Sequence, residues 1–370
     1  MIPEPEPGLG RPGPGTGPDG VPTAIAVSPI LSARVRSQDL DRIRAAAPGS
    51  RIINLSVEGL ADGPLEDIEV LLRGWLSSEA FDRLLARAPR LRWVHSATSG
   101  VERALTPAAR DRSITVTNAR GVFTRPIAEH VLMLILAISR RLPQLLELQR
   151  ERTWQPLQGV ELREMTIGIV GYGSIGRAVA SLAGAFGARV IALRRHPDRE
   201  NPSRPGSATR AGARGDDLED LSDAFPFIPS PMRIVGPDGL HELLGASDIV
   251  VLAAPLTATT ENMIDRAAIR AMRKEAWIIN VARGRLIDDE ALIEALREHR
   301  IGGAALDAFR QEPLPPTSPF YDLSNVIVTP HTAWSSSRVL DRSIDLFCEN
   351  LRRYSAGESL RNVVDPGAGY

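Results

Sequence analysis

Thr166-Ile-Gly-Ile-Val-Gly-Tyr-Gly-Ser-Ile-Gly176 decides the fold of this chain, because here an apolar run passes directly into a glycine-rich turn. The glycines follow the pattern G-x-G-x-x-G. Gly171 permits a tight turn, Gly173 lets the backbone approach a pyrophosphate, and Gly176 lets a helix pack closely on the strand. A small-residue helical pattern and a second apolar run at 189–193 follow. The stretch therefore predicts a nucleotide-binding β-α-β unit; the alternative is a glycine-rich turn that serves packing alone.

The residues after the second apolar run bear on which dinucleotide is bound. Chains that prefer NAD place an acidic side chain about 20 residues beyond the glycines, where it accepts hydrogen bonds from the ribose hydroxyls. Here Arg194 and Arg195 stand in that place. A guanidinium group can bind a 2′-phosphate through two charge-assisted hydrogen bonds, whereas a carboxylate would repel it. The sequence therefore favours NADP(H) over NAD(H); the alternative is a solvated arginine pair in an arginine-rich chain.

The composition excludes several classes of chemistry and partner. The chain has 370 residues, enough for two domains, and its net charge of -1 argues against a general binder of nucleic acid or of membrane surfaces. Lys274 is the only lysine, and its charged setting does not suit lysine-centred catalysis. The single cysteine, Cys348, excludes an intrachain disulfide and a cysteine-cluster metal site. Its apolar helical setting favours a packing role.

No export or anchoring signal is recognisable in the sequence. Residues 1–22 are dominated by Pro, Gly and acidic residues, lack the apolar core of a signal peptide, and are expected to form a disordered tail. The most apolar run, 131–138, is shorter than the roughly 20 residues that a membrane span needs, so a buried helix is predicted there. The cytoplasm is therefore the expected compartment.

Apolar runs typical of strands alternate with helical patterns along the chain, which predicts parallel sheets in an α/β fold. The first series of expected strands is 24–27, 51–55, 92–95 and 114–117, and the second is 167–170, 189–193, 248–252, 277–280, 303–306 and 325–328. Two doubly wound sheets are therefore expected. Residues 197–236 are crowded with Pro, Gly, Ser, Asp and Arg, fit neither series, and are expected to form a long loop or partly disordered insertion.

Polar residues follow three strands of the second series, and such strand ends form the ligand crevice in open α/β sheets. The segments are Asn280-Val-Ala-Arg-Gly-Arg285, Leu306-Asp-Ala-Phe-Arg-Gln-Glu-Pro313 and Thr329-Pro-His-Thr-Ala-Trp334. Reduction of a 2-oxo acid needs a cation for the carboxylate, an acid that protonates the developing alkoxide, and a group that tunes that acid. Arg283, His331 and Glu312 supply those three parts. The alternatives are a structural ion pair between Arg283 and Glu312 and a helix-capping role for His331.

The remaining histidines show no metal-binding pattern. No pair has the spacing of metal ligands on a common helix face, so no metal is expected. His130, His241 and His299 occur in helical patterns of ordinary composition and are expected to be structural. His95 lies nearer the expected crevice, and a structural role is favoured for it as well.

Together with the glycine pattern, the three strand-end motifs resemble those of the D-isomer-specific 2-hydroxyacid dehydrogenases, the family of phosphoglycerate dehydrogenase, hydroxypyruvate reductase and glyoxylate reductase. The similarity spans about residues 90–335. It implies a Rossmann NAD(P)-binding domain inserted into a flavodoxin-like substrate domain, with cofactor and substrate in the cleft between them. The implied boundaries are 23–121 for the substrate domain, 122–330 for the cofactor domain and 331–370 for the return of the chain. Family members are generally homodimers that pair through the cofactor domain, and the helix near Val131 would contribute to that surface.

The resemblance also implies roles for individual residues. Arg283 would bind the substrate's carboxylate and carbonyl oxygen, His331 would donate a proton to that oxygen, and Glu312 would orient the imidazole and favour its charged form. The family's substrate loop falls on Ser99, Gly100 and Val101, whose amides would receive the substrate carboxylate. Beyond the glycines, the implied cofactor contacts at the pyrophosphate are Ser174 and Ile175, with Pro255 and Thr260 in the loop beside it. Those at the nicotinamide are Val281, Ala282 and Asp307, and Asp307 would accept a hydrogen bond from the carboxamide. Those at the catalytic end are Arg283, His331 and Ala333.

Two positions depart from the family pattern. Arg194 replaces the usual acidic residue, which bears on cofactor choice rather than on catalysis, and the 197–236 insertion is longer than the usual connection. The favoured function is an NADP(H)-preferring reductase of a small 2-oxo acid, with glyoxylate or hydroxypyruvate first. NAD-linked oxidation of 3-phosphoglycerate is one alternative. A cofactor-sensing binding protein like the C-terminal-binding corepressors, which share the fold, is another.

Overall fold

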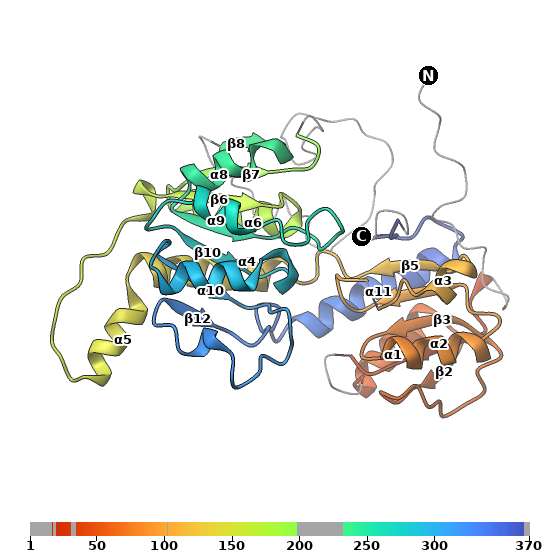
Figure 1. Cartoon of the computed structure of the whole chain (residues 1–370). Coiled ribbons are helices and arrows are strands. Elements are labelled where there is room, and N and C mark those ends of the chain that lie inside the picture. The colour runs from red at the N-terminus through yellow and green to blue at the C-terminus, as the bar shows by residue number, and fades with distance from the viewer. Residues whose placement is uncertain (1–16, 18–19, 31–34, 102, 198–231, 366–370) are drawn as a thin grey trace, which may run out of the picture. The chain divides into compact units, whose positions relative to one another are not determined.

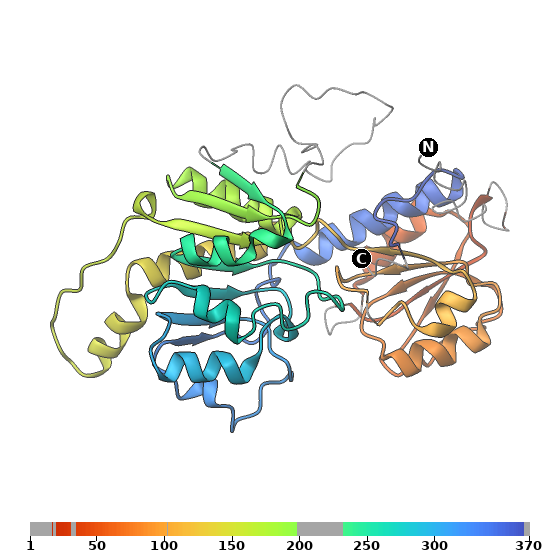
Figure 2. The same ribbon diagram turned by 45° about the horizontal axis from the view of Figure 1, so that its top comes forward.

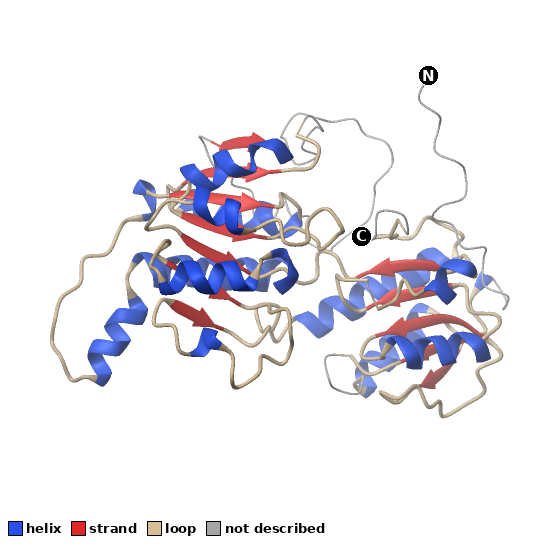
Figure 3. Cartoon of the chain, viewed as in Figure 1, coloured by secondary structure: helices blue, strands red, loops and turns tan. Residues whose placement is uncertain are grey.

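The structure, a computed structural model, describes residues 17, 20–30, 35–101, 103–197 and 232–365. It divides into two compact units (Figure 1): unit 1 comprises residues 1–123 and 337–370, and unit 2 comprises residues 124–336. Each unit is a parallel sheet with helices on both faces (Figure 3), which confirms the expected α/β fold class. The sequence predicts that the chain passes from the substrate domain to the cofactor domain at 121–122 and returns at 330–331. Most of the expected 1–22 tail lies outside the described residues.

Unit 1 is built on a five-stranded sheet with strand order β2-β1-β3-β4-β5, the order of flavodoxin-like folds. Its strands are β1 (Ala24–Val27), β2 (Arg51–Asn54), β3 (Ile68–Arg73), β4 (Trp93–Ser96) and β5 (Thr115–Asn118). Its helices are α1 (Ser37–Ala46), α2 (Ser78–Arg87), α3 (Pro107–Asp111) and α11 (Val339–Ser355). Helices α1 and α11 cover one face and α2 and α3 cover the other (Figure 2).

The central strand β3 is absent from the strands expected from sequence, because it carries two charged residues. All of β3 is buried, including Glu69 and Arg73. Glu69 accepts a hydrogen bond from the Thr23 amide at 3.0 Å. The Arg73 guanidinium donates to the Leu76 carbonyl at 2.6 Å and lies over the Phe81 ring, 5.3 Å from its centre. Charges that find such partners inside a domain interrupt the apolar pattern by which a buried strand is recognised.

The core between the sheet of unit 1 and α11 is aromatic. Trp93 stacks on Tyr354 with 5.4 Å between ring centroids and lies 5.5 Å from Phe347. The Trp93 indole donates to the Thr117 hydroxyl at 2.8 Å, and Nδ1 of His95 lies 2.8 Å from the same hydroxyl. Burial lowers the pKa of His95 to about 3, so the ring is neutral at physiological pH. His95 is therefore a core residue of unit 1.

The single cysteine of the chain lies in the same core. Cys348 is buried in α11 and packs with Ile43 of α1 and with Ile344. Burial raises the pKa of its thiol to about 11, so the reactive thiolate is scarce at neutral pH. Cys348 thus has the packing role expected from its apolar helix.

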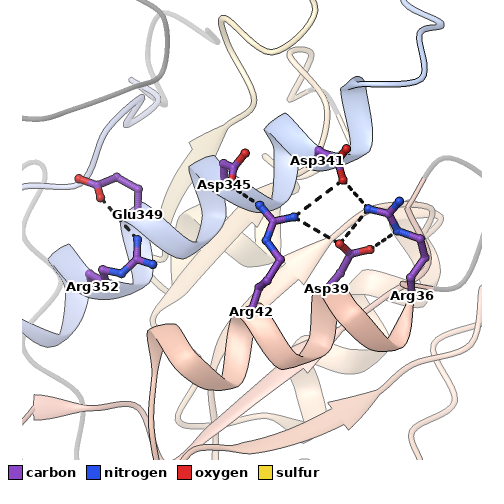
Figure 4. A network of polar contacts seen from close by, with 7 residues as sticks. All are labelled: Arg36, Asp39, Arg42, Asp341, Asp345, Glu349 and Arg352. Carbon is purple, nitrogen blue, oxygen red and sulfur yellow. Dashed lines mark hydrogen bonds and ion pairs between the residues drawn. The ribbon is translucent and has the colours of Figure 1, made fainter.

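A charged network joins α1 to α11 (Figure 4). The Asp39 carboxylate is 0% exposed and accepts from the Arg36 guanidinium at 2.6 and 2.9 Å and from Arg42 at 3.4 Å. Both arginines also reach α11, where Arg36 pairs with Asp341 and Arg42 pairs with Asp345. Because a buried carboxylate is costly without cations, these two arginines compensate the burial of Asp39 and tie the first helix of unit 1 to the last.

Unit 2 is built on a seven-stranded sheet with strand order β12-β11-β10-β9-β6-β7-β8, a doubly wound Rossmann arrangement. Its strands are β6 (Thr166–Val170), β7 (Arg189–Leu193), β8 (Met232–Val235), β9 (Ile249–Leu252), β10 (Trp277–Asn280), β11 (Gly303–Leu306) and β12 (Val326–Val328). Its α-helices are α4 (Thr124–Ser139), α5 (Leu142–Arg150), α6 (Ser174–Ala185), α8 (Leu240–Ala246), α9 (Arg266–Ala271) and α10 (Asp289–Arg297). Short 3₁₀ helices are Leu162–Glu164, Pro237–Gly239, Gly284–Leu286 and Pro319–Tyr321. Helices α4 and α6 share one face, and α8, α9 and α10 cover the other.

Strand β8 contradicts the expectation that residues 197–236 form a loop throughout. Met232–Val235 pairs in parallel with β7, with Val190 opposite Met232 and Leu193 opposite Val235. The strand is four residues long and partly exposed at the edge of the sheet. Glycine and proline follow it directly, and because these residues are typical of turns, the sequence pattern indicates a loop instead of a short strand. Residues 198–231 of the expected insertion lie outside the described residues.

The helix expected around residues 131–138 is α4. Its buried side chains include Val131, Leu134 and Ile135. Among the residues that the structure describes, no helix has both the length and the apolar content that crossing a membrane requires.

Candidate active site

The glycine-rich turn between β6 and α6 has the geometry that close ligand approach requires. Gly171 has a φ of +105°, and an added Cβ there would lie 2.5 Å from the Ala254 nitrogen. An added Cβ at Gly176 would lie 2.1 Å from the Gly171 carbonyl oxygen, so α6 packs directly on the turn. At Gly173, by contrast, an added Cβ would meet nothing within 4 Å. This open position precedes Ser174, where α6 begins with amides that have no partner within the helix, so the turn fits a pyrophosphate.

Arg194 and Arg195 follow β7 beside this turn. The Leu193 carbonyl accepts from the amides of Gly171 and Tyr172, each at 3.1 Å, and so ties the end of β7 to the turn. Burial raises the pKa of the Tyr172 phenol, and the charges of Arg177 and Arg194 oppose that shift. Arg195 is exposed. Both arginines therefore stand at the end of β7 where the sequence expects the adenosine ribose.

The loop after β9 is closed by the Thr260 hydroxyl. This hydroxyl donates to the Pro255 carbonyl at 2.7 Å and accepts from the Thr257 amide at 2.8 Å. The backbone at Ala253 and Ala254 packs on Gly171, so the loop borders the glycine-rich turn. The Thr260 hydroxyl thus holds the shape of the loop, and cofactor contacts of Pro255 and Thr260 stay predictions.

Arg283 stands on a turn that follows β10 and is held from inside by Asn280. The buried Asn280 side chain donates from Nδ2 to the Arg283 carbonyl and accepts at Oδ1 from the Ala282 amide, both at 3.0 Å. The Arg283 guanidinium donates to the Ala282 carbonyl at 2.8 Å. Val281 is buried beneath the turn. The sequence motif gives this asparagine no role, whereas its two hydrogen bonds shape the backbone that carries Arg283.

The turn after β10 lies directly on the loop after β11. An added Cβ at Gly284 would lie 2.0 Å from the carbonyl carbon of Phe309 and 2.2 Å from the nitrogen of Arg310. Arg310 in turn donates to the Ile287 carbonyl at 2.8 Å. Only a residue without a side chain allows this backbone contact. Gly284 thereby sets the distance between the segments that carry Arg283 and Glu312, a role that the sequence pattern does not reveal.

His331 and Glu312 form a hydrogen-bonded pair. Nδ1 of His331 lies 2.7 Å from Oε2 of Glu312, and Oε1 of Glu312 accepts from the Phe309 amide at 2.9 Å. The two side chains are 40% and 37% exposed, so the pair can be reached by a ligand. Because Nδ1 is engaged by the carboxylate, Nε2 is the ring nitrogen that can face a substrate.

The pair shifts the pKa of both groups. The hydrogen bond with Glu312 raises the pKa of His331 above its usual 6.5, burial opposes this, and the charges of Glu312 and Asp307 add to it. Burial raises the pKa of Glu312, but the hydrogen bonds from His331 and the Phe309 amide and the nearby charges of His331 and Arg283 outweigh it and leave that pKa lowered. Arg283 is therefore close enough to act on both groups. The site favours an imidazolium beside a carboxylate.

The Asp307 carboxylate holds the loop that carries His331. Asp307 is 1% exposed, and it accepts from the Thr332 amide at 2.9 Å and from the Ala333 amide at 3.0 Å. The Thr329 hydroxyl donates to the same carboxylate at 2.6 Å. Between these anchors, His331 takes a left-handed backbone with a φ of 49°. The structure thus gives Asp307 a role in the loop, while its expected contact with a cofactor carboxamide stays a prediction.

The expected substrate loop lies in unit 1, after β4. The Asn118 side chain donates to the Ser99 carbonyl at 3.0 Å, and the Thr98 hydroxyl donates to the Gly100 carbonyl at 2.7 Å. The Val101 carbonyl accepts from two amides of the following turn, at 2.8 and 2.9 Å. The loop is therefore fixed through its carbonyl groups. Binding of a substrate carboxylate by its amides stays a prediction.

The structure brings most of the expected residues together within unit 2. Arg283, Glu312 and His331 follow the adjacent strands β10, β11 and β12, at the same edge of the sheet as the glycine-rich turn. Among the described residues, no group of three or more His, Cys, Asp or Glu side chains is arranged to hold a metal ion.

Comparison with known proteins gives matches along most of the chain. A family model described as the NAD-binding domain of D-isomer-specific 2-hydroxyacid dehydrogenases matches residues 132–228 and 231–333. A glyoxylate reductase of Thermofilum pendens is 35% identical over 294 residues, which make up 78% of this chain and 78% of that protein. A solved structure of a D-isomer-specific 2-hydroxyacid dehydrogenase from Xanthobacter autotrophicus, in complex with NADPH and MES, is similar with a TM-score of 0.76 and 29% identity, covering 95% of this chain and 100% of that one. An NADPH-dependent glyoxylate/hydroxypyruvate reductase from Sinorhizobium meliloti, in complex with NADP and sulfate, has a TM-score of 0.74 and 25% identity, covering 94% and 100%.

Proposed function

The chain belongs to the D-isomer-specific 2-hydroxyacid dehydrogenases, NAD(P)-dependent oxidoreductases, and we propose that it reduces a small 2-oxo acid, glyoxylate or hydroxypyruvate first, with NADPH as the preferred donor. The observation that carries this proposal is the pair of His331 and Glu312, 2.7 Å apart, at the sheet edge that also holds the glycine-rich turn. The similarity to a glyoxylate reductase and to a glyoxylate/hydroxypyruvate reductase supports the choice of substrate.

The chain's own residues supply the proton and bind the substrate. When bound, the nicotinamide supplies a hydride to the carbonyl carbon. His331, held at Nδ1 by Glu312, donates a proton from Nε2 to the carbonyl oxygen as that oxygen gains negative charge. The raised pKa of His331 favours the protonated ring that this step needs, and the neutral ring is the base for the reverse direction. Arg283 pairs with the substrate carboxylate and fixes the carbonyl group against rotation.

Catalysis is tested by following nicotinamide absorbance with glyoxylate, hydroxypyruvate and, in the oxidative direction, 3-phosphoglycerate. We expect turnover of the 2-oxo acids, and we expect His331→Ala to lower kcat by about 10²- to 10⁴-fold, the usual contribution of a general acid. Cofactor affinity should fall much less than kcat, because the glycine-rich turn and the arginines after β7 stay intact in this variant. The exposed His241→Ala on α8 is the matched control. Turnover that survives the loss of His331 would refute the assignment.

The preference for NADPH rests on Arg194 and Arg195 at the end of β7. Two observations support it: the similar structures were solved with NADPH and with NADP, and no acidic residue stands at this place in the sequence. We expect the double variant Arg194→Ser with Arg195→Ser to raise KM for NADPH and to leave KM for NADH nearly unchanged, because the lost bonds go to the 2′-phosphate alone. Arg150→Ser, an exposed position on α5, is the control. An equal effect on both cofactors would contradict the phosphate role.

We also propose that the protein is a homodimer formed through unit 2. Helix α5 has nine residues, none of them buried, and exposes Leu142, Leu145 and Leu146. Trp154, in the segment that follows, is 101% exposed, and Figure 1 shows α5 and this segment standing away from the sheet of unit 2. A helix this short is marginal in water without packing, and clustered apolar exposure marks an interaction surface.

Sedimentation equilibrium tests the dimer. The wild type should have twice the chain mass, and Leu145→Glu should convert it to a monomer, because a buried charge in the interface is costly. Glu147→Gln, on the same helix, is the control and should stay dimeric. A wild-type protein with the mass of one chain would refute the proposal.

A further inference from the structure

The loop anchor Asp307 has a neighbour on α4 that the proposed mechanism does not use. His130 places Nε2 3.3 Å from the Thr329 hydroxyl and 4.0 Å from Oδ1 of Asp307. Its side chain is 12% exposed. The three residues come from α4, from the end of β11 and from the end of β12, so the contact joins segments that are far apart in the sequence.

The hydrogen bonds between these groups have one consistent direction. Thr329 gives its single hydroxyl hydrogen to Asp307 at 2.6 Å, so towards His130 the same oxygen can only accept. Nε2 of His130 therefore carries the hydrogen. Burial lowers the pKa of His130, against the opposing charge of Asp307, so the ring is neutral near pH 7. A neutral ring with its hydrogen on Nε2 completes a chain from His130 through Thr329 to Asp307.

Asp307 connects this chain of hydrogen bonds to the loop that carries His331. Its carboxylate also accepts from the amides of Thr332 and Ala333, which stand directly after His331. The other end of the chain of hydrogen bonds is fixed, because α4 is a 16-residue helix that buries Ile127, Val131 and Leu134 in unit 2. The partly buried Thr329 hydroxyl and the buried Asp307 carboxylate, hydrogen-bonded in this way, hold one loop conformation.

We infer that His130 is a positioning residue of the catalytic loop: it fixes the Thr329 hydroxyl, and through Asp307 it holds the backbone that aims His331. The ring touches neither Glu312 nor His331 in the contacts of the described residues, so its effect passes through Thr329 and Asp307. The inference rests on the proposed function for its kinetic part only, because the order of the loop can be measured without turnover.

Two substitutions separate the hydrogen bond from the volume of the ring. His130→Phe keeps a ring but removes the donor, and His130→Gln keeps an N–H donor on a flexible side chain. Should His130→Phe not fold, His130→Asn replaces it, because its shorter side chain stops short of Thr329. His241→Gln, on the exposed surface of α8, is the matched control.

Hydrogen–deuterium exchange of residues 329–334 and steady-state kinetics are measured on the same proteins. In His130→Phe we expect exchange of the Thr332 and Ala333 amides to rise about tenfold and kcat to fall about tenfold, the effect of one lost hydrogen bond. The KM for the 2-oxo acid and the Kd for NADPH should change little. His130→Gln should recover most of both effects, and His241→Gln should match the wild type.

Three outcomes are decisive. Unchanged exchange and kcat in His130→Phe overturn the inference. Equal losses in the Phe and Gln variants overturn it as well, because they assign the effect to ring packing. If the wild type turns over no 2-oxo acid, the proposed function fails, whereas exchange of the loop in the same variants still decides whether His130 positions it.

Discussion

Gly284→Ala should separate the two backbone segments that carry Arg283 and Glu312. The added Cβ would lie 2.0 Å from the carbonyl carbon of Phe309, whereas ordinary contacts of a Cβ begin at 3.4 Å. The segments must therefore move apart by about 1.4 Å, the difference between these distances. Both sides of the contact are backbone, so no side chain can turn away to relieve it.

The size of this movement sets the expected effects. A misplacement of about 1 Å in an active site can cost about 100-fold in rate, so kcat/KM for the 2-oxo acid should fall by about that factor. Forcing extra volume into a packed contact should lower the free energy of unfolding by about 1–3 kcal/mol. NADPH affinity should change little, since the glycine-rich turn lies after a different strand, β6.

The measurements are initial rates from nicotinamide absorbance, NADPH titration by fluorescence, and urea unfolding. Gly63→Ala is the control, because an added Cβ there would meet the Ile53 side chain at an ordinary 3.5 Å. A Gly284→Ala enzyme with wild-type kcat/KM would show that the two segments are not held together by this contact, and the reasoning would fail.

Three further results are expected. Glu312→Gln removes the charge that raises the pKa of His331, so the decline of kcat/KM with rising pH should begin at a lower pH than in the wild type, and an unchanged pH profile would contradict the pairing. The pKa of His95 is about 3 in the folded protein and 6.5 in the unfolded chain, so between pH 6.5 and pH 3 its burial should lower the free energy of unfolding by up to about 1.4 kcal/mol for each pH unit. Urea unfolding of His95→Gln should lack this loss. Asp39→Asn should lower the free energy of unfolding by about 1–3 kcal/mol because buried charged hydrogen bonds are lost, while Asp41→Asn, exposed on the same helix, should change it by less than about 0.5 kcal/mol in the same urea titration.

The parts of the fold that follow a local pattern could be predicted from sequence. The glycine-rich turn and the apolar strands around it identify the Rossmann sheet, and the fold class is confirmed. Strands β3 and β8 escaped prediction for two physical reasons. Strand β3 carries the charges of Glu69 and Arg73, which break its apolar pattern and are held inside the unit by the Thr23 amide and the Leu76 carbonyl. Strand β8 is a short edge strand that glycine and proline follow directly.

From the sequence, the site residues could be predicted where their side-chain type and their position after a strand are enough to identify them. Arg283, Glu312 and His331 carry the chemistry and follow strands, so motif and topology together point to them. The supporting residues could not be found in this way. Asn280, Gly284 and the His130–Thr329–Asp307 chain act through contacts between separate segments, and only the three-dimensional structure shows which segments meet.

The buried thiol of Cys348 makes unit 1 its own reporter. Since the chain has no other cysteine, a thiol-specific reagent can label the protein only when α11 separates from the core of unit 1. The rate of labelling under native conditions therefore measures how often this local opening occurs. Unit 2 has no cysteine, so the rate of labelling measures the opening of unit 1 alone.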